Sequence, residues 1–517
     1  MGAFSSGISR RQILKAAAGL AVVPPPGPGA GLGTGSGAGL GAGPKVVEQT
    51  LDVRFTEVSV PGYGRVTTRT YNGTIPGPTL RVRAGDVLRL TSVNGLPPNP
   101  PHARHGGEHP APHHPNSFNL HTHGMHVSPS GYADNVLREF APRSVAGGPE
   151  PRYSSVIHVP AGHPAGTYWY HPHLHGSTAE QIVGGMAGVI VVEGDVDEVP
   201  EIAAAAEVVL CINELKIKDG RIPAFTSGGW VNDIPSTFTV NGAVNPTVAL
   251  RPGEVQRWRL VAATAFTALR LRICDLTLHQ IACDGVTFSA PVAREAVDLA
   301  MGNRADVLVR GGAPGTYELR AEGVPDPLMT IEVAGTPVEP PMPLPSSLPL
   351  GRPFLDAAAV TAEREVLFHV DPGVFPGPFP NAFRVLGSHP TPAADPSGDL
   401  RRDPAYGLFD AHYTNHTLRL GTVERWTVRT DETLPAHNHP FHLHTNQFLV
   451  THRNGTRLDP PVWHDTVGLA GGRPGESVTF LVRYEDFTGR ALAHCHQLHH
   501  EDLGMMQSVE YVEGVGA

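Results

Sequence analysis

One pattern recurs three times along the 517-residue chain and sets the size of its structural unit. Its copies read PTLRVRAGD from Pro78, PTVALRPGE from Pro246 and HTLRLGTVE from His416. Each copy predicts a strand with alternating apolar side chains, then a turn, then the start of a second strand. The copies lie 168 and 170 residues apart, so the repeat unit has the length of a whole β-sandwich.

Composition indicates an all-β chain and excludes two kinds of partner. Glycine (59) and proline (51) are frequent, and the segments between them are short and rich in Val, Leu and Thr, as in strands joined by turns. The formal net charge is -10, and no basic stripe stands out. We therefore expect neither nucleic acid nor an anionic membrane surface as a partner.

The N-terminus has the form of a targeting segment. Residues 9–15 (SRRQILK), followed by the small apolar run 16–23, resemble a twin-arginine export signal; the alternative is a plain basic tail. The apolar run is much shorter than the roughly 20 residues that span a bilayer, so we expect no membrane anchor. Residues 24–44 are almost all Gly, Pro and Ala and predict a linker. We expect export by the twin-arginine machinery to the periplasm, the cell envelope or the outside.

These segments divide the chain into four parts. Residues 1–44 are the predicted signal and linker, 45–196 the first sandwich, 197–345 the second and 346–517 the third. A further motif recurs near the end of each sandwich, and the fifth residue after its glycine is His171, Arg320 or His494. The second sandwich therefore lacks the metal-type side chains of the other two, and we interpret it as a spacer.

Histidines in pairs two residues apart are the strongest signal for a metal site. Side chains two apart on a strand point to the same face, so each pair presents two imidazoles together. Among the 28 histidines, the pairs are His121 and His123, His171 and His173, His442 and His444, and His494 and His496. Eight imidazoles exceed what one ion needs and are about right for three.

Cys495 lies between the two histidines of the last pair. If His494 and His496 face one site, Cys495 must face the other way, toward a second site. His439, His500 and Met505 are suitably spaced to join it, and two imidazoles, a thiolate and a thioether match a blue-copper electron-transfer site. One strand would then connect two metal sites covalently.

These residues resemble the motifs of the multicopper oxidases, including laccases and bacterial copper-tolerance oxidases. The likeness includes the His-x-His pairs, the Cys495 motif, and phrases without ligands such as residues 71–78 (YNGTIPGP), and it extends over nearly everything from about residue 45. It implies three consecutive cupredoxin-like Greek-key β-sandwich domains and, as in relatives of this size, a monomer. It also implies four copper ions per chain, which couple one-electron oxidation of a donor to reduction of O2 to water.

The resemblance further implies which residue binds which copper. Type 1 copper would be held by His439, Cys495, His500 and Met505. Type 2 copper would be held by His121 and His442. The type 3 pair would be held by His123, His171, His173, His444, His494 and His496.

Two carboxylates resemble the acidic residues that supply protons in relatives. They are Glu501, next to His500, and Asp134. Water formation needs protons, and a carboxylate near the cluster can exchange them with solvent. The alternative role for both is to orient histidines by hydrogen bonds.

Other histidines and cysteines have no expected role in the metal sites. We expect none for His126, His175, His437 and His499, and the histidine-rich loop 98–115 is either a solvated linker or a copper-capture loop. Trp169 and Tyr170 are expected in the core. Cys274 and Cys283 do not lie opposite each other in a simple hairpin register, so we expect Cys211, Cys274 and Cys283 to be free, buried thiols.

The electron donor is less constrained than the reaction. Copper-tolerance members often carry a methionine-rich insert, but this chain has only eight Met, clustered only at 505–506. This favours phenols or aromatic amines, with Cu(I) or Fe(II) as the alternative, and we expect the donor to reach an exposed edge of His500. A copper nitrite reductase would not need eight histidines. A non-catalytic envelope protein or copper store would be expected to have lost ligands.

Overall fold

The structure is a computed structural model that describes residues 22–23, 44–101, 112–225, 230–375, 379–387, 407–431, 438–470 and 475–514. Most of the predicted export signal, His437 and most of the histidine-rich loop lie outside these residues. The described chain is nearly all strand, and its strands form six sheets. The all-β prediction is therefore confirmed.

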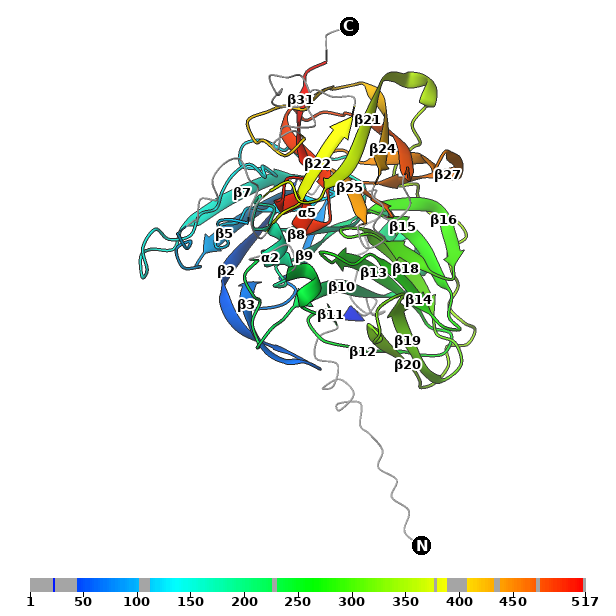
Figure 1. Ribbon diagram of the computed structural model, residues 1–517. Helices are drawn as coiled ribbons and strands as arrows, with labels where there is room; N and C mark the ends of the chain where they lie inside the picture. The colour runs from blue at the N-terminus through cyan, green and yellow to red at the C-terminus, as the bar shows by residue number, and fades with distance from the viewer. Residues whose placement is uncertain are drawn as a thin grey trace.

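The sheets pair into three sandwiches that follow one another along the chain (Figure 1). The first sandwich has a 4-stranded sheet of β3 (Gly64–Tyr71), β2 (Val46–Val60), β5 (Val87–Asn94) and β7 (Arg152–His158). Its second 4-stranded sheet contains β4 (Leu80–Arg83), β9 (Gly188–Glu193), β8 (Gly166–His171) and β6 (His121–His123).

The second sandwich has the largest sheet. Its 7 strands are β1 (Val22–Val23), β10 (Ala206–Lys216), β13 (Val255–Ala263), β18 (Arg304–Arg310), β15 (Leu278–Cys283), β16 (Val286–Arg294) and β11 (Ser236–Val240). The 5-stranded partner sheet contains β12 (Thr247–Leu250), β20 (Met329–Val333), β19 (Gly315–Ala321), β14 (Leu269–Ile273) and β17 (Val297–Leu299). The strand β1 comes from the predicted signal and pairs antiparallel with β10.

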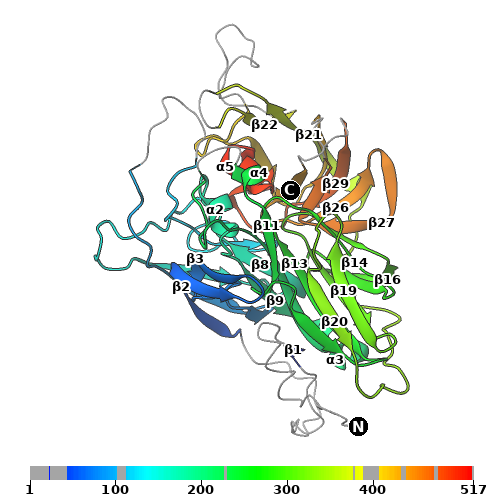
Figure 2. The same cartoon turned by 60° about the horizontal axis from the view of Figure 1, so that its bottom comes forward.

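The third sandwich lies at the top of Figure 1 and on the upper right of Figure 2. Its 6-stranded sheet contains β22 (Ala382–Gly387), β21 (Val360–Asp371), β24 (Val423–Thr430), β29 (Ser477–Arg483), β26 (Phe448–Arg453) and β27 (Thr456–His464). The 5-stranded sheet contains β23 (His416–Arg419), β31 (Met506–Val512), β30 (Gly489–Cys495), β25 (His439–Leu443) and β28 (Thr466–Leu469).

The sequence repeat corresponds to a repeated topology. In each sandwich the strand that contains the repeated motif pairs in parallel with the last strand, as β4 with β9, β12 with β20 and β23 with β31. The following strand pairs in parallel with the first long strand of its sandwich, as β5 with β2, β13 with β10 and β24 with β21. The exact domain boundaries at residues 44, 196 and 345 stay a prediction.

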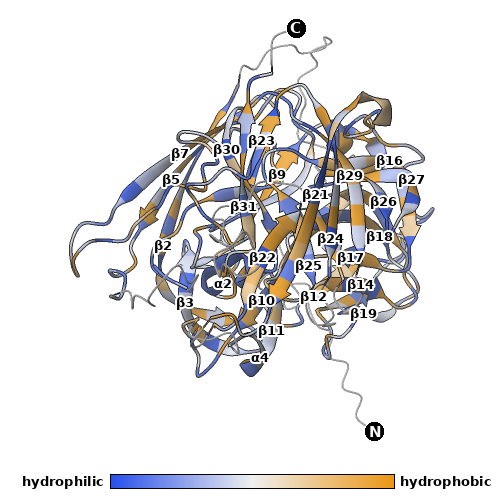
Figure 3. Ribbon diagram, turned by 45° about the horizontal axis from the view of Figure 1, so that its top comes forward, coloured by the Kyte–Doolittle hydropathy of each residue, from blue (hydrophilic) through white to orange (hydrophobic). Residues whose placement is uncertain are grey.

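Hydrophobic burial between the two sheets stabilises each sandwich. Bands of hydrophobic and hydrophilic residues alternate along many strands (Figure 3), which is the pattern of a strand with one face in a core. The three largest buried clusters contain Leu88 and Tyr170 in the first sandwich, Trp258 in the second, and Trp426 in the third. Removing such apolar area from water contributes about 25 cal/mol per Å².

The helices within the described residues are few and short. They are α2 (Thr178–Ile182), α3 (Pro200–Ala203), α4 (Trp230–Asp233) and α5 (Leu498–Asp502), with 3-10 turns η1 (Asp195–Glu198) and η2 (Ala357–Ala359). In the described part of the chain, no helix has the length and apolar character needed to cross a bilayer. The Asp502 carboxylate, at the end of α5, accepts hydrogen bonds from the backbone N–H groups of Gly176, Thr178 and Ala179. This contact fixes the first sandwich against the third beside the candidate site.

Candidate metal centre

Two pairs of adjacent strands bring the paired histidines together. In the first sandwich, His121 on β6 lies directly opposite His171 on β8. In the third sandwich, His442 on β25 lies directly opposite His494 on β30. The two sandwiches therefore present matching histidine-bearing sheet ends to each other.

All eight paired imidazoles are buried and converge between the first and third sandwiches. The Nε2 atom of His444 lies 3.1 Å from that of His173 and 3.2 Å from that of His494. The Nε2 atoms of His121 and His442 are 3.3 Å apart. Ligand nitrogens about 2 Å from one ion at tetrahedral angles are about 3.3 Å apart, so these distances suit shared metal ions.

The hydrogen-bond partners of the clustered histidines determine which ring nitrogen carries the proton, and they leave a nitrogen lone pair directed into the cluster. His121 Nδ1 lies 3.0 Å from the Asp134 carboxylate, and His442 Nδ1 lies 2.8 Å from the Asp465 backbone carbonyl. The Asp465 carbonyl and the ionised form of Asp134 accept hydrogen bonds, and with these partners each Nδ1 carries the proton and each Nε2 is unprotonated. His123 has the opposite arrangement: its Nε2 contacts Asp465, and its Nδ1 lies 3.4 Å from His171 Nε2. Nitrogen lone pairs that face each other repel, and a cation between them would relieve this repulsion.

Two further observations fit a metal cluster. Among the described residues, neither ring nitrogen of buried His496 has a hydrogen-bond partner, which is costly unless a ligand takes up the lone pair. Burial, followed by repulsion from neighbouring imidazoles, lowers the pKa of the rings well below the usual value in His121, His123, His442, His444 and His496. Neutral imidazole is the form that binds metal ions.

Cys495 faces a separate site, as its place between the two histidines predicts. Its Sγ lies 3.6 Å from His439 Nδ1 and 3.7 Å from His500 Nδ1. Met505 is fully buried in the same hydrophobic cluster, and its backbone carbonyl accepts a hydrogen bond from Cys495 N. Burial raises the pKa of the Cys495 thiol, so a thiolate there needs a neighbouring cation. Two imidazole nitrogens and one sulfur at these distances could hold a soft metal ion.

Comparison with known proteins assigns this arrangement to a family. Three family models, each described as multicopper oxidase, match residues 109–197, 217–336 and 383–515. Together these models match more than half of the chain. The chain belongs to the multicopper oxidase family.

The relatives of this multicopper oxidase have different names. It is 27% identical to the cell division protein FtsP of Salmonella typhimurium over 80% of this chain and 78% of that protein. It is 26% identical to a laccase of Bacillus stratosphericus over 86% of this chain and 90% of the laccase. A solved structure of a multicopper oxidase from Campylobacter jejuni, described as a metallo-oxidase, superposes with a TM-score of 0.68 at 24% identity and covers 92% of this chain and 95% of that one. This last likeness confirms the cupredoxin-like fold.

Both predicted carboxylates contact histidines of the cluster. Glu501 is fully buried, with Oε2 at 3.2 Å from His494 Nδ1 and Oε1 at 3.5 Å from His173 Nδ1. Burial opposes its ionisation, but these imidazoles outweigh that effect and lower the pKa of Glu501 to about 2. Burial raises the pKa of Asp134 to about 8, although the Thr122 N–H donates to this carboxylate. Each carboxylate therefore lies within contact distance of the Nδ1 atom of a clustered histidine, on the side of the ring away from its Nε2.

The expectation of an exposed His500 is wrong. The imidazole is fully buried, and the Phe383 ring, on β22, stacks on it with centroids 4.3 Å apart. The His499 ring packs beside Phe383 and Phe266, with its centroid 5.7 Å from that of Phe383 and 5.3 Å from that of Phe266. Sequence periodicity could not show this cover because β22 lies more than 100 residues before His500 in the chain.

The remaining histidines that were predicted to have no metal role make interfacial contacts. His126 bridges the first and third sandwiches, with Nε2 at 2.7 Å from Asp486 and Nδ1 at 2.8 Å from the Thr445 carbonyl. The His175 ring packs on Phe409, with centroids 5.2 Å apart. Whether loop 98–115 captures copper stays a prediction.

The core and cysteine predictions have a mixed outcome. Trp169 and Tyr170 are fully buried, as expected, and Trp169 also stacks on His171 at 4.2 Å. All four cysteines are free, but Cys274 is exposed, which corrects its predicted burial. Cys274 and Cys283 do not pair, because Cys274 directly follows β14 while Cys283 ends β15, and these strands belong to different sheets.

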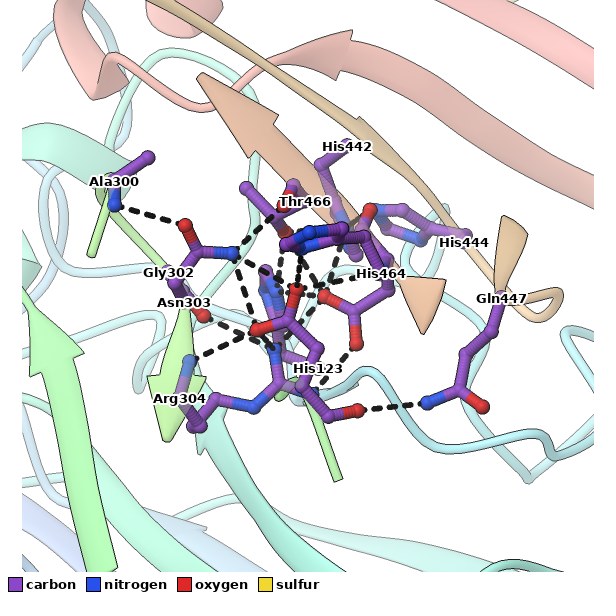
Figure 4. A network of polar contacts seen from close by, with 12 residues as sticks. His123, Ala300, Gly302, Asn303, Arg304, His442, His444, Gln447, His464 and Thr466 are labelled. Atoms are coloured by element: carbon purple, nitrogen blue, oxygen red, sulfur yellow. Dashed lines mark hydrogen bonds and ion pairs between the residues drawn. The ribbon is translucent and has the colours of Figure 1, made fainter. Parts of the chain in front are cut away.

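Two polar residues of the site have no motif in the sequence. Asp465 and Thr466 lie at the junction of β27 and β28 and contact His123 Nε2 at 3.2 and 3.0 Å. Figure 4 labels Thr466 and His123 in this network of polar contacts. The interpretation of the second sandwich as a spacer is also incomplete. Its Arg304 lies buried within the same network.

Proposed function

We propose that this multicopper oxidase binds four copper ions and couples one-electron oxidation of small donors to reduction of O2 to water. The end of β30 and the residue after it carry this proposal, because His494 and His496 belong to the histidine cluster while Cys495 belongs to the separate site. The proposed type 1 ligands are His439, Cys495, His500 and Met505. The proposed trinuclear ligands are the eight paired histidines, with His121 and His442 for type 2 copper and the other six for the type 3 pair.

Bound copper would supply the electron transfer and the O2 chemistry. The protein supplies the path, since His494 and His496 adjoin Cys495 in the chain and link both sites through covalent bonds. It also excludes bulk water, because every proposed ligand is buried. Glu501 lies beside His494 and Asp134 lies beside His121, and we propose that both carboxylates relay protons from solvent to the reduced oxygen.

We propose phenols and aromatic amines as donors, because the chain lacks a methionine cluster that would gather Cu(I). The second candidate is oxidation of Cu(I) or Fe(II). The Phe383 cover favours it, because an aromatic donor cannot place its ring directly on His500. With either donor class, we propose that the electron passes from the donor across the Phe383 ring to His500.

An oxygen-electrode comparison tests these proposals. Copper-loaded protein is given a phenol, an aromatic diamine, Cu(I) and Fe(II) in turn, and copper per chain and visible absorption are measured on the same sample. We expect the intense colour of a Cu(II)-thiolate and oxygen consumption with the aromatic donors. If only Cu(I) or Fe(II) supports oxygen consumption, metal ions and not aromatic compounds are the donors. Colour without oxygen consumption would instead indicate a copper store or an electron-transfer protein.

A structural role is the non-catalytic alternative, and the likeness to a cell division protein motivates it. The complete set of histidines argues against it, since a protein without copper chemistry is not expected to keep them. We further propose that the chain is exported through its N-terminal twin-arginine segment to the periplasm, envelope or outside and acts as a monomer. Fractionation of cells with Arg10 and Arg11 replaced by Lys tests the export route, and sedimentation tests the monomer.

A further inference from the structure

The second sandwich contributes no histidine pair, yet Arg304 at the start of β18 is buried beside the histidine cluster. Figure 4 shows its guanidinium between the second sandwich and the residues around His123 and His442. Burying a charge costs free energy unless the charge is fully paired. The partners of the Arg304 guanidinium therefore indicate the role of this residue.

The guanidinium forms a two-point ion pair with Asp465 of the third sandwich. Its Nη1 donates to Oδ1 at 2.8 Å and its Nη2 donates to Oδ2 at 2.6 Å. The guanidinium Nε donates to the Thr167 carbonyl of the first sandwich, and Asp284 adds a second carboxylate at 3.4 Å from Nη1. One side chain therefore connects all three sandwiches, and the fork of the guanidinium fixes the plane of the Asp465 carboxylate.

Asp465 in turn holds two proposed ligands. Its Oδ1 lies 3.2 Å from His123 Nε2, and this contact requires the His123 lone pair to be on Nδ1, which faces the cluster. The Asp465 backbone carbonyl accepts a hydrogen bond from His442 Nδ1 at 2.8 Å. The orientation of both imidazoles thus depends on the position of Asp465.

The contacts from Arg304 through Asp465 to His123 are closely packed. A Cβ atom added at Gly124, the residue after His123, would lie 2.2 Å from Arg304 Nη2 and 2.4 Å from Asp465 Oδ2. A Cβ atom at Gly302, two residues before Arg304, would lie 3.0 Å from His123 and 3.1 Å from His496. Both glycines also have positive φ, so other residues would be strained there.

We propose that Arg304 is a positioning residue of the trinuclear copper site, acting through Asp465 on His123 and His442. This inference rests on the proposed function, since it concerns how the chain holds that site. It gives the second sandwich a part in copper binding instead of a spacing role alone. Removing a partner that orients a metal ligand typically weakens metal affinity about 10- to 100-fold.

The test compares Arg304→Met with Arg257→Met. Arg257 is a matched control because it is also a buried arginine of the second sandwich that pairs with a buried aspartate, and its carboxylate partners are Asp306 and Asp197 instead of Asp465. Copper affinity is measured by competition with a chelator, and visible absorption and electron paramagnetic resonance separate type 1 from type 2 copper. The melting temperature of the copper-free proteins measures structural damage.

We expect both variants to melt at lower temperatures. Only Arg304→Met should lower the affinity for trinuclear copper, by about 10- to 100-fold, and change the type 2 signal. The visible colour that depends on Cys495 should persist in both variants. Arg304→Lys keeps the positive charge but loses the two-point contact. Its affinity for trinuclear copper should therefore lie between those of Arg304→Met and the parent protein. Equal trinuclear affinity and an unchanged type 2 signal in Arg304→Met and Arg257→Met would overturn the proposal.

The controls separate this inference from the proposed function. If the unmodified protein binds no trinuclear copper, the function itself fails. If the unmodified protein binds the copper but consumes no oxygen, the affinity comparison still decides the role of Arg304. If Arg304→Met does not fold, Asp465→Asn preserves the shape of the network, and an unchanged type 2 signal in that variant would contradict the proposal.

Discussion

His121 and His442 are 321 residues apart in the chain, and their Nε2 atoms lie 3.3 Å apart at the boundary between the first and third sandwiches. Each imidazole is held from behind, by Asp134 and by the Asp465 carbonyl, so that its lone pair points toward the other. Such a contact is repulsive without a cation. Metal binding and docking of the two sandwiches are therefore expected to depend on each other.

Copper removal is expected to lower the stability of the protein. A ligand that binds only the folded state at about 1,000 times its Kd stabilises that state by about 4 kcal/mol. We expect the melting temperature of the chelated protein to fall and to return when copper is added back. Calorimetry of both forms would show this, and equal melting temperatures would mean that the histidines hold no tightly bound ion.

Replacing Cys495 by Ser should separate the two sites. The hydroxyl is a poor ligand for soft copper, so the visible colour and donor oxidation should fall to background. The trinuclear copper should remain, because His494 on β30 and His496 just after it keep their positions. Copper analysis and absorption spectra check this outcome, and retained donor oxidation would contradict the electron path.

Replacing Glu501 by Gln should slow oxygen reduction while copper stays bound. The amide keeps the shape beside His173 and His494 but cannot exchange a proton. Proton transfer by a positioned side chain contributes about 10²- to 10⁴-fold, so we expect at least about a 10²-fold lower kcat. Stopped-flow reoxidation of reduced protein measures this step, and Asp134→Asn gives the comparison. An unchanged rate with full copper content would leave Glu501 an orienting role only.

Shortening Phe383 should change donor selection. Phe383→Ala uncovers the His500 ring that Phe383 now stacks on, so kcat/KM for bulky phenols should rise relative to that for Fe(II). The same change removes a buried ring and should cost about 3–5 kcal/mol of stability. Phe383→Leu is the matched control, because it keeps most of the cover. Steady-state rates for both donor classes test this, and a ratio that does not change would show that the cover does not limit access.

Much of the fold was predictable from the chain because local rules determine it. Strand alternation, turn residues and the repeat at Pro78, Pro246 and His416 predict three sandwiches without any knowledge of tertiary contacts. Pleating similarly predicts that Cys495 and its neighbours face different sites, because adjacent side chains on a strand point in opposite directions. The cysteine and its flanking histidines do lie this way.

Only the tertiary structure decided what surrounds those residues. Phe383, which covers His500, and Arg304, which reaches the cluster through Asp465, come from strands far from the ligands in the chain. Neither has a periodic pattern or a motif, since their contacts depend on how whole sandwiches pack. The sequence alone thus determined the sandwiches and the pairing of imidazoles, because backbone geometry repeats along every strand. The burial of His500 and the contact of the second sandwich with the histidine cluster were decided by contacts between distant segments.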